Sequence, residues 1–140
     1  MAERKDDSCD IVHADRERLV HFGRSATPGH VLAGCDILVF PSIYDTCAKV
    51  VLEAMAMGLS VITSSASGLV DVIDDGENGF VVENPNDVDA FVKPLSLLVR
   101  DPELREQVGT RAASYIAEHR TWEHTVAETR RTYELVASAE

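Results

Sequence analysis

The sequence predicts an α/β protein in which a parallel sheet carries helices on both of its faces. Short apolar runs alternate along the chain with segments of helical pattern. The runs are continuously apolar, which is typical of strands buried on both faces, and strands separated by helices join in parallel through right-handed crossovers. A chain of 140 residues is long enough for one such domain with a real core.

The first half of the chain supplies most of the predicted strands. Residues 1–17 are polar and indicate no regular element, so the predicted domain occupies residues 18–140. The run "RLVHFG" at 18–23 predicts a short strand closed by glycine, and "PGHVLAG" at 28–34 predicts a short helix. The run "CDILVF" at 35–40 predicts a buried strand that a proline ends.

A helix is predicted over 46–57, with Gly58 in the left-handed position just past its end. The run "LSVITSS" predicts a third strand, "GLVDVIDDGENG" a helical turn followed by two glycine turns, and "FVV" a fourth strand. From Asn86 onward the pattern is helical, in three segments that start near Asp87, Asp101 and Thr121. We expect Pro94 to kink or restart the first of them, and Trp122 to anchor the last against the domain.

Two acids in the segment 41–58, "PSIYDTCAKVVLEAMAMG", are the candidate functional residues. In open parallel sheets, ligands bind beyond the carboxyl ends of the strands, where free N–H groups of the following helix can receive an anion. Asp45 is equally well explained as the cap of that helix or as a ligand contact. Glu53 stands among apolar residues, so we expect it to be buried and to need a partner. Eight positions of helix separate the two acids by about 12 Å, which suits two parts of one long ligand but not a shared proton.

Composition excludes several other classes of function. A formal net charge of −11 argues against a nucleic-acid partner, because phosphate binding needs clustered basic residues. The three cysteines have no paired spacing and the histidines no metal-ligand spacing, which predicts a reduced, cytoplasmic protein without a metal site. Neither a signal-peptide core nor an apolar run long enough for a membrane span is present in the sequence.

Residues 35–82 resemble the nucleotide-sugar-binding core of the group 1 glycosyltransferases of the GT-B fold, a large retaining family. The shared motifs are an Asp-led strand ending in Pro-Ser, a Glu-Ala-x-Ala-x-Gly helix, a Val-Ile strand and an Asp-Gly-x-x-Gly turn. The matching residues are Asp36, Pro41, Ser42, Glu53, Ala54, Ala56, Gly58, Val61, Ile62, Gly68, Asp75, Gly76 and Gly79. The similarity extends over roughly 18–136 and implies part of the C-terminal, Rossmann-like donor domain, with about four strands and a helical tail.

The resemblance implies which residues would bind the donor sugar. Asp45 would hold hydroxyls of the sugar, and the backbone N–H groups of Cys47, Ala48 and Lys49 would face the sugar and the diphosphate. Most members of the family have Glu where this chain has Asp45, and often Gly where it has Ala48. The acid is therefore one methylene shorter, which leaves the identity of the sugar open.

The resemblance also implies the nucleotide-binding residues. Glu53 would accept hydrogen bonds from the ribose hydroxyls, while Val50 and Gly23 would line the nucleotide pocket. Uridine diphosphate is the expected nucleotide because it is frequent in the family, and a glycan or a lipid is the expected acceptor. Enzymes of this type generally need no metal, so no metal or other cofactor is expected.

Two parts of such an enzyme have no counterpart in the sequence. These are the strands that carry a Gly-rich turn and a basic clamp for the diphosphate, and the amino-terminal domain that binds the acceptor. We therefore expect the chain to be inactive by itself, and we expect its partners to be the nucleotide sugar and either that domain or, through exposed strands, a second copy. Strands at 18–23 and 35–40 would have exposed edges, which favour self-association.

Two alternatives remain open on the sequence. A receiver-like signalling module would also be acidic and of this length, but the acidic pair that such modules carry after the first strand is missing. The stronger alternative keeps the fold and changes the function: a non-catalytic, truncated remnant or interaction module that binds nucleotide weakly or not at all.

Overall fold

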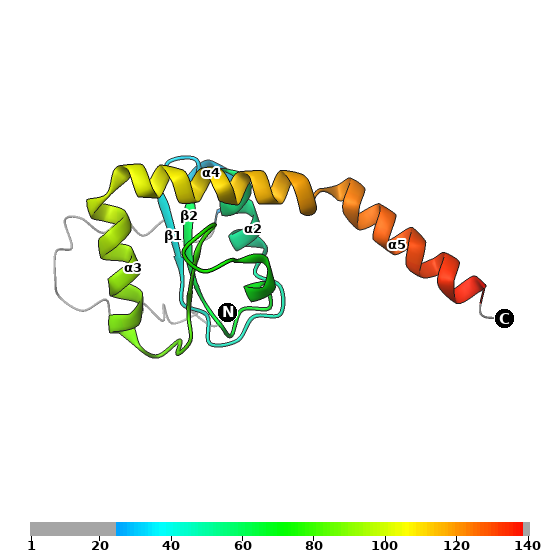
Figure 1. Cartoon of the computed structure of the whole chain (residues 1–140), viewed down its shortest axis with the longest axis horizontal. Helices are drawn as coiled ribbons and strands as arrows, with labels where there is room; N and C mark the ends of the chain where they lie inside the picture. The colour runs from blue at the N-terminus through cyan, green and yellow to red at the C-terminus, as the bar shows by residue number, and fades with distance from the viewer. Residues whose placement is uncertain (1–24, 139–140) are drawn as a thin grey trace, which may run out of the picture.

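The computed structural model describes residues 25–138, which form a three-stranded parallel sheet with helices on both faces (Figure 1). The strands are β1 (Ile37–Phe40), β2 (Ser60–Ser64) and β3 (Phe80–Val82), and they lie side by side in chain order. This arrangement confirms the predicted fold class. The further strand predicted at 18–23 lies outside the described residues.

The helices of residues 25–138 follow the predicted order. They are α1 (Pro28–Leu32), α2 (Lys49–Ala56), the 3₁₀ helix η2 (Val70–Val72), α3 (Val88–Arg100), α4 (Pro102–His119) and α5 (Trp122–Ala137). The side chains of Asp87 and Asp101 accept hydrogen bonds from the backbone N–H groups of Ala90 and Leu104. Asp87 thus caps α3 as expected, and Asp101 caps α4, which begins at Pro102. In this part of the chain no helix combines the length and hydrophobicity that crossing a membrane requires.

The first turn of α2 differs from the prediction. The helix begins at Lys49 rather than Thr46, and Ala48 is the residue at the cap position. The reason lies in the preceding loop, where an Asp45 carboxylate oxygen accepts a hydrogen bond of 2.8 Å from the Cys47 N–H. The Lys49 N–H also donates to the Cys47 carbonyl at 2.7 Å, so residues 45–48 form a tight turn that is not helical. Asp45 therefore does not cap α2, whereas Gly58 ends it at φ +78° as predicted.

Pro94 does not restart a helix, because α3 runs unbroken through it from Val88 to Arg100. Proline removes one backbone hydrogen bond from the helix. Phe91 and Leu98, before and after the proline, are both buried in the core. This packing holds the helix together despite the lost bond.

Two hydrophobic clusters place the helices on opposite faces of the sheet. One cluster joins α2 and α4 to the sheet through Val51, Ala54, Met55, Val61 and Ala112. The other joins α3 to the opposite face through Ile62, Val82, Phe91 and Leu98. The neighbouring β2 residues Val61 and Ile62 belong to different clusters, as the two-residue period of a strand requires.

All five residues of the central strand β2 are fully buried, although three of them carry hydroxyl groups. These hydroxyls donate hydrogen bonds to backbone carbonyl oxygens of three other segments: Ser60 to Arg105, Thr63 to Phe40, and Ser64 to Ser42. Each buried hydroxyl thus has a partner and its burial is not penalised.

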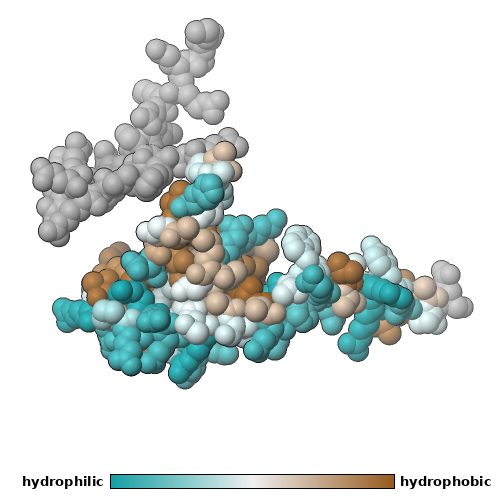
Figure 2. Space-filling model, turned by 90° about the horizontal axis from the view of Figure 1, so that it is seen from above, coloured by the Kyte–Doolittle hydropathy of each residue, from teal (hydrophilic) through white to brown (hydrophobic). Residues whose placement is uncertain are grey.

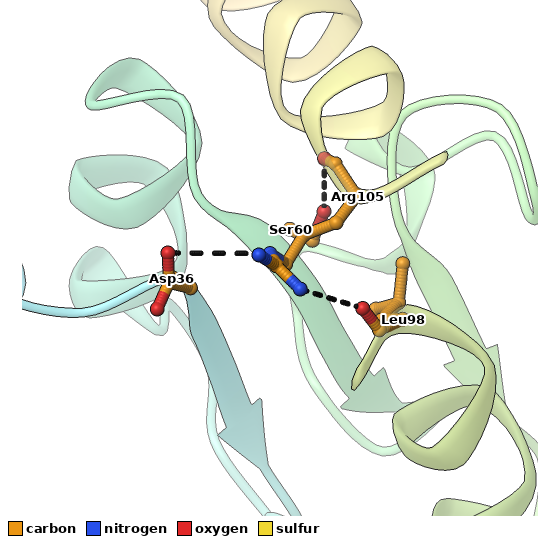
Figure 3. Close-up of polar contacts among 4 residues, drawn as sticks. All are labelled: Asp36, Ser60, Leu98 and Arg105. Carbon is orange, nitrogen blue, oxygen red and sulfur yellow. Dashed lines mark hydrogen bonds and ion pairs between the residues drawn. The ribbon is translucent and has the colours of Figure 1, made fainter. Parts of the chain in front are cut away.

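Arg105, in the first turns of α4, connects that helix to α3 and to the start of the sheet (Figure 3). Its carbonyl accepts the Ser60 hydroxyl at 2.8 Å, and its guanidinium donates to the Leu98 carbonyl at 2.9 Å. The guanidinium also lies 4.0 Å from the Asp36 carboxylate, which is 79% exposed. The exposed ion pair contributes little, so the two hydrogen bonds are what fix α4 here.

The outer edge of β3 is partly covered by a side chain. Phe80 and Val82 turn their backbone groups toward β2, so the N–H of Val81 points away from the sheet. This N–H donates to the Asp75 carboxylate at 2.9 Å. One backbone donor of the edge strand is therefore already satisfied.

Helix α5 extends away from the rest of the structure, and none of its residues is buried (Figure 1). Trp122 is 81% exposed, so the expectation that it anchors this helix against the domain is wrong. Figure 2 shows apolar side chains along the protruding helix. The large ones are Trp122, Val126, Tyr133, Leu135 and Val136.

Helix α4 crosses the end of α2 at two glycines. A Cβ atom added to Gly109 would lie 2.0 Å from the carbonyl oxygen of Gly58. The Gly58 oxygen belongs to the backbone, and the backbone also fixes the position of a Cβ, so no change of rotamer can relieve this contact. The spacing between α2 and α4 therefore depends on glycine at position 109.

Replacing Gly109 with alanine is expected to destabilise the fold by about 1–3 kcal/mol, the usual cost of forcing extra volume into a packed site. Urea denaturation followed by circular dichroism measures the change. Gly34→Ala is the matched control, since a Cβ there meets its nearest atom at 3.7 Å. Equal midpoints for Gly109→Ala and wild type would show that the two helices can separate without cost.

Candidate functional site

The loop after β1 is held at the carboxyl end of the sheet by backbone hydrogen bonds. The N–H of Gly68 donates to the Asp45 carbonyl at 2.7 Å, and the Asp45 N–H donates to the Ala66 carbonyl at 3.4 Å. The buried Ser64 hydroxyl holds the Ser42 carbonyl at the start of the same loop. Segments following two neighbouring strands thus fix the position of Asp45.

Glycine at position 68 is required by this close approach. A Cβ atom there would lie 2.1 Å from the carbonyl oxygen of Thr46 and 3.1 Å from that of Asp45. Any side chain at this position would displace the loop that carries Asp45.

Two of the backbone N–H groups at the entrance to α2 already donate hydrogen bonds within the chain. The Cys47 N–H donates to the Asp45 carboxylate at 2.8 Å, and the Lys49 N–H donates to the Cys47 carbonyl at 2.7 Å. Within residues 25–138 the Ala48 N–H has no hydrogen-bond partner. The Asp45 carboxylate therefore organises the loop in this structure.

Glu53 lies on the exposed side of α2, which corrects the expectation that it is buried. Val51, Ala54 and Met55 form the buried face of this short helix, and Lys49 shares the exposed face with Glu53. The exposed carboxylate needs no partner from the chain itself, so it is available to a ligand.

A groove of about 570 Å³ lies along this exposed face of α2. It is lined by Cys47, Lys49, Leu52, Glu53, Ala56, Ile116, Arg120, Trp122 and Thr125. The first five belong to α2 and its entrance, and the others to the end of α4 and the start of α5. Two cations, one carboxylate and an apolar floor suit a ligand that has both hydroxyl and anionic groups.

Of the predicted site residues, the groove brings together Cys47, Lys49 and Glu53. Asp45 belongs to the adjoining loop and does not line the groove. Ala48 is buried and Val50 is half-buried beneath the helix entrance. Gly23 lies outside the described residues.

Sequence reasoning missed the other six residues of the groove, of which Arg120 and Trp122 carry the groups best suited to bind a ligand. Both follow Glu53 by more than sixty positions, in a segment that the sequence predicts only as the end of one helix and the start of the next. The corner between α4 and α5 brings them opposite α2. The only local signal of this corner in the sequence is the break in the helical pattern near Thr121.

One carboxyl group at this corner has a shifted pKa. A hydrogen bond with the Thr121 side chain, assisted by the Glu123 backbone, lowers the pKa of Glu123 below its usual value. The negative charge then stands at the N-terminus of α5, where the helix dipole favours it. Among residues 25–138 no three His, Cys, Asp or Glu side chains gather in a way that could hold a metal ion.

Comparison with known proteins identifies the family. A family model described as "Glycosyl transferases group 1" matches residues 14–115. The alpha-maltose-1-phosphate synthase of Mycolicibacterium smegmatis is 29% identical over 128 residues, which are 85% of this chain and 33% of the relative. The chain thus spans about a third of that relative. It spans 16% of the sulfoquinovosyl transferase of Arabidopsis thaliana and 25% of a glycosyltransferase of Methanocaldococcus jannaschii.

Solved structures of similar fold agree with this result. The C-terminal domain of LpcC, a group 1 glycosyltransferase of Francisella tularensis, is 25% identical at a TM-score of 0.64 and covers 71% of this chain and 51% of its own. TarM of S. aureus, solved as a mutant with fondaparinux, alpha-GlcNAc-glycerol and UDP, is 26% identical at a TM-score of 0.74 and covers 84% of this chain and 24% of its own. The chain belongs to the group 1 glycosyltransferases and has the fold of part of their C-terminal GT-B domain.

Proposed function

We propose that this chain provides the donor-binding part of a transferase that moves a sugar from a nucleoside-diphosphate sugar, UDP-linked, to a glycan or lipid acceptor. Family membership over residues 14–115 is the observation that supports this function most. A related structure that contains UDP supports the choice of nucleotide.

In this proposal Glu53 accepts hydrogen bonds from the ribose hydroxyls, and Val50 packs beneath the nucleotide. Glu53 is exposed and lines a groove of ligand size, which supports the role. Gly23, outside the described residues, completes the nucleotide pocket.

Asp45, Cys47, Ala48 and Lys49 hold the sugar and the diphosphate. The Ala48 N–H, free of partners within residues 25–138, receives a ligand oxygen directly. The Cys47 N–H would first exchange the Asp45 carboxylate for the ligand. Freed in this way, the carboxylate can turn to the sugar hydroxyls.

The chain should bind UDP, and Glu53→Ala should weaken that binding roughly 10- to 100-fold, the range expected for hydrogen bonds to a charged group. Isothermal titration calorimetry measures both affinities. Glu106→Ala is the matched control, because Glu106 is also exposed on a helix but does not line the groove. Failure of the wild-type chain to bind UDP at millimolar concentration would overturn the proposal and leave a remnant without nucleotide binding.

Gly68→Ala should reduce stability by about 1–3 kcal/mol and weaken UDP binding, because the new methyl group displaces the loop that carries Asp45 and Cys47. Denaturation and calorimetry measure the two effects. Gly29→Ala is the control, since nothing lies within 4 Å of a Cβ at that position. A Gly68→Ala chain as stable as wild type would contradict the required close approach.

The isolated chain should not transfer sugar at a measurable rate. The match to the alpha-maltose-1-phosphate synthase takes in 85% of this chain but only about a third of that relative. The rest of such an enzyme must therefore supply further contacts. Release of UDP from UDP-sugars, assayed with glycan and lipid acceptors, tests this. Sustained turnover by the chain alone would be the contrary result.

A further inference from the structure

We infer that Arg120 and Trp122 form the second wall of the nucleotide site, in which Arg120 binds a phosphate and Trp122 stacks on the base. This inference rests on the proposed function and deepens it. It assigns nucleotide contacts to the corner between α4 and α5, which lies far along the chain from the Asp45 to Glu53 segment.

The two walls of the groove carry complementary groups. On the α2 side stand Lys49 and Glu53, one helical turn apart, and on the other side stand Arg120 and Trp122. The apolar side chains of Leu52, Ala56 and Ile116 also line the groove. A volume of about 570 Å³ falls within the range of small-molecule sites, and a nucleoside diphosphate is a ligand of that class.

The charges of the groove favour an anionic occupant. Within residues 25–138 neither Lys49 nor Arg120 forms an ion pair, although the chain as a whole has a net charge of −11. Lys49 and Glu53 face the same groove yet are not paired with each other. Two unpaired cations suit the two phosphates of a nucleoside diphosphate, and the planar guanidinium of Arg120 matches phosphate geometry.

The indole of Trp122 suits a planar partner. It is 81% exposed, although an indole gains more from burial than almost any other side chain. Aromatic side chains stack on nucleic-acid bases because every base has a π-face. A base lying on Trp122 would place its ribose between the two walls, facing Glu53, and its phosphates between Lys49 and Arg120.

The local backbone holds both residues at the corner. Arg120 ends α4 with its N–H donating to the Ile116 carbonyl at 2.9 Å, and Trp122 is the first residue of α5. Thr121 separates them, and its hydroxyl is 2.9 Å from the His124 ring nitrogen. Two consecutive helix ends thus fix the position from which Arg120 and Trp122 extend.

Trp122 is the single tryptophan of the chain, so its fluorescence reports directly on the groove. Titration with UDP should change the emission of Trp122 with the same midpoint that calorimetry gives. Uridine and inorganic phosphate are the partial ligands for comparison. Trp122→Phe should keep most of the affinity for UDP and uridine, whereas Trp122→Ala should lose affinity for both.

Arg120→Gln should weaken UDP binding about tenfold or more, the scale of a charge-assisted hydrogen bond, while leaving uridine binding unchanged. Arg131→Gln is the matched control, because Arg131 is an exposed residue of α5 that does not line the groove. All variants change exposed or half-buried side chains, and their unfolding midpoints should equal that of wild type.

The outcomes separate the two proposals. UDP binding by calorimetry with unchanged Trp122 emission, or with wild-type affinity in Arg120→Gln, overturns the inference and leaves the proposed function standing. A response to inorganic phosphate equal to that to UDP overturns the base contact of Trp122. Absence of any UDP binding overturns the inference together with the proposed function.

Discussion

The arrangement of the structure depends on the hydroxyl groups of its central strand. β2 is fully buried, so each of its hydroxyl groups needs a hydrogen-bond partner inside the protein. Ser60, Thr63 and Ser64 instead donate to carbonyl groups of α4, of the end of β1 and of the loop after β1. Because a hydrogen bond is directional and a hydrophobic contact is not, these bonds help to fix α4, the end of β1 and the loop after β1 relative to β2.

The same strand helps to position the loop and the helix on either side of the candidate site. The loop that carries Asp45 is held at Ser42 by a β2 hydroxyl and at Asp45 by the segment following β2. On the opposite side, α4 is tied to the first residue of β2 through Arg105, and Gly109 allows α4 to lie against the end of α2. The strand β2 thus holds both the loop that precedes α2 and the helix α4, two segments that lie far apart in the sequence.

The sequence predicted the class, order and approximate ends of the elements in residues 25–138, because apolar runs, capping acids and punctuating glycines are local signals. It mistook the start of α2, where residues 45–48 form a tight, non-helical turn instead of the first turn of the helix. It took Glu53 to be buried because the apolar residues around it leave no clean polar face on the helix predicted over 46–57. The exposure of Trp122 and its place beside Glu53 depend on the angle between α4 and α5, which is a tertiary property without a local signature.

The bond between the Asp75 side chain and the Val81 N–H has a consequence for behaviour in concentrated solution. An edge strand can pair with a strand of another molecule when its own backbone donors and acceptors are unpaired, and this pairing begins a larger β assembly. At β3 one donor is occupied, and the occupying group carries a negative charge that repels a second copy of an acidic chain. A strand of three residues protected in this way is a poor template for a further strand, which disfavours aggregation through this edge of the sheet.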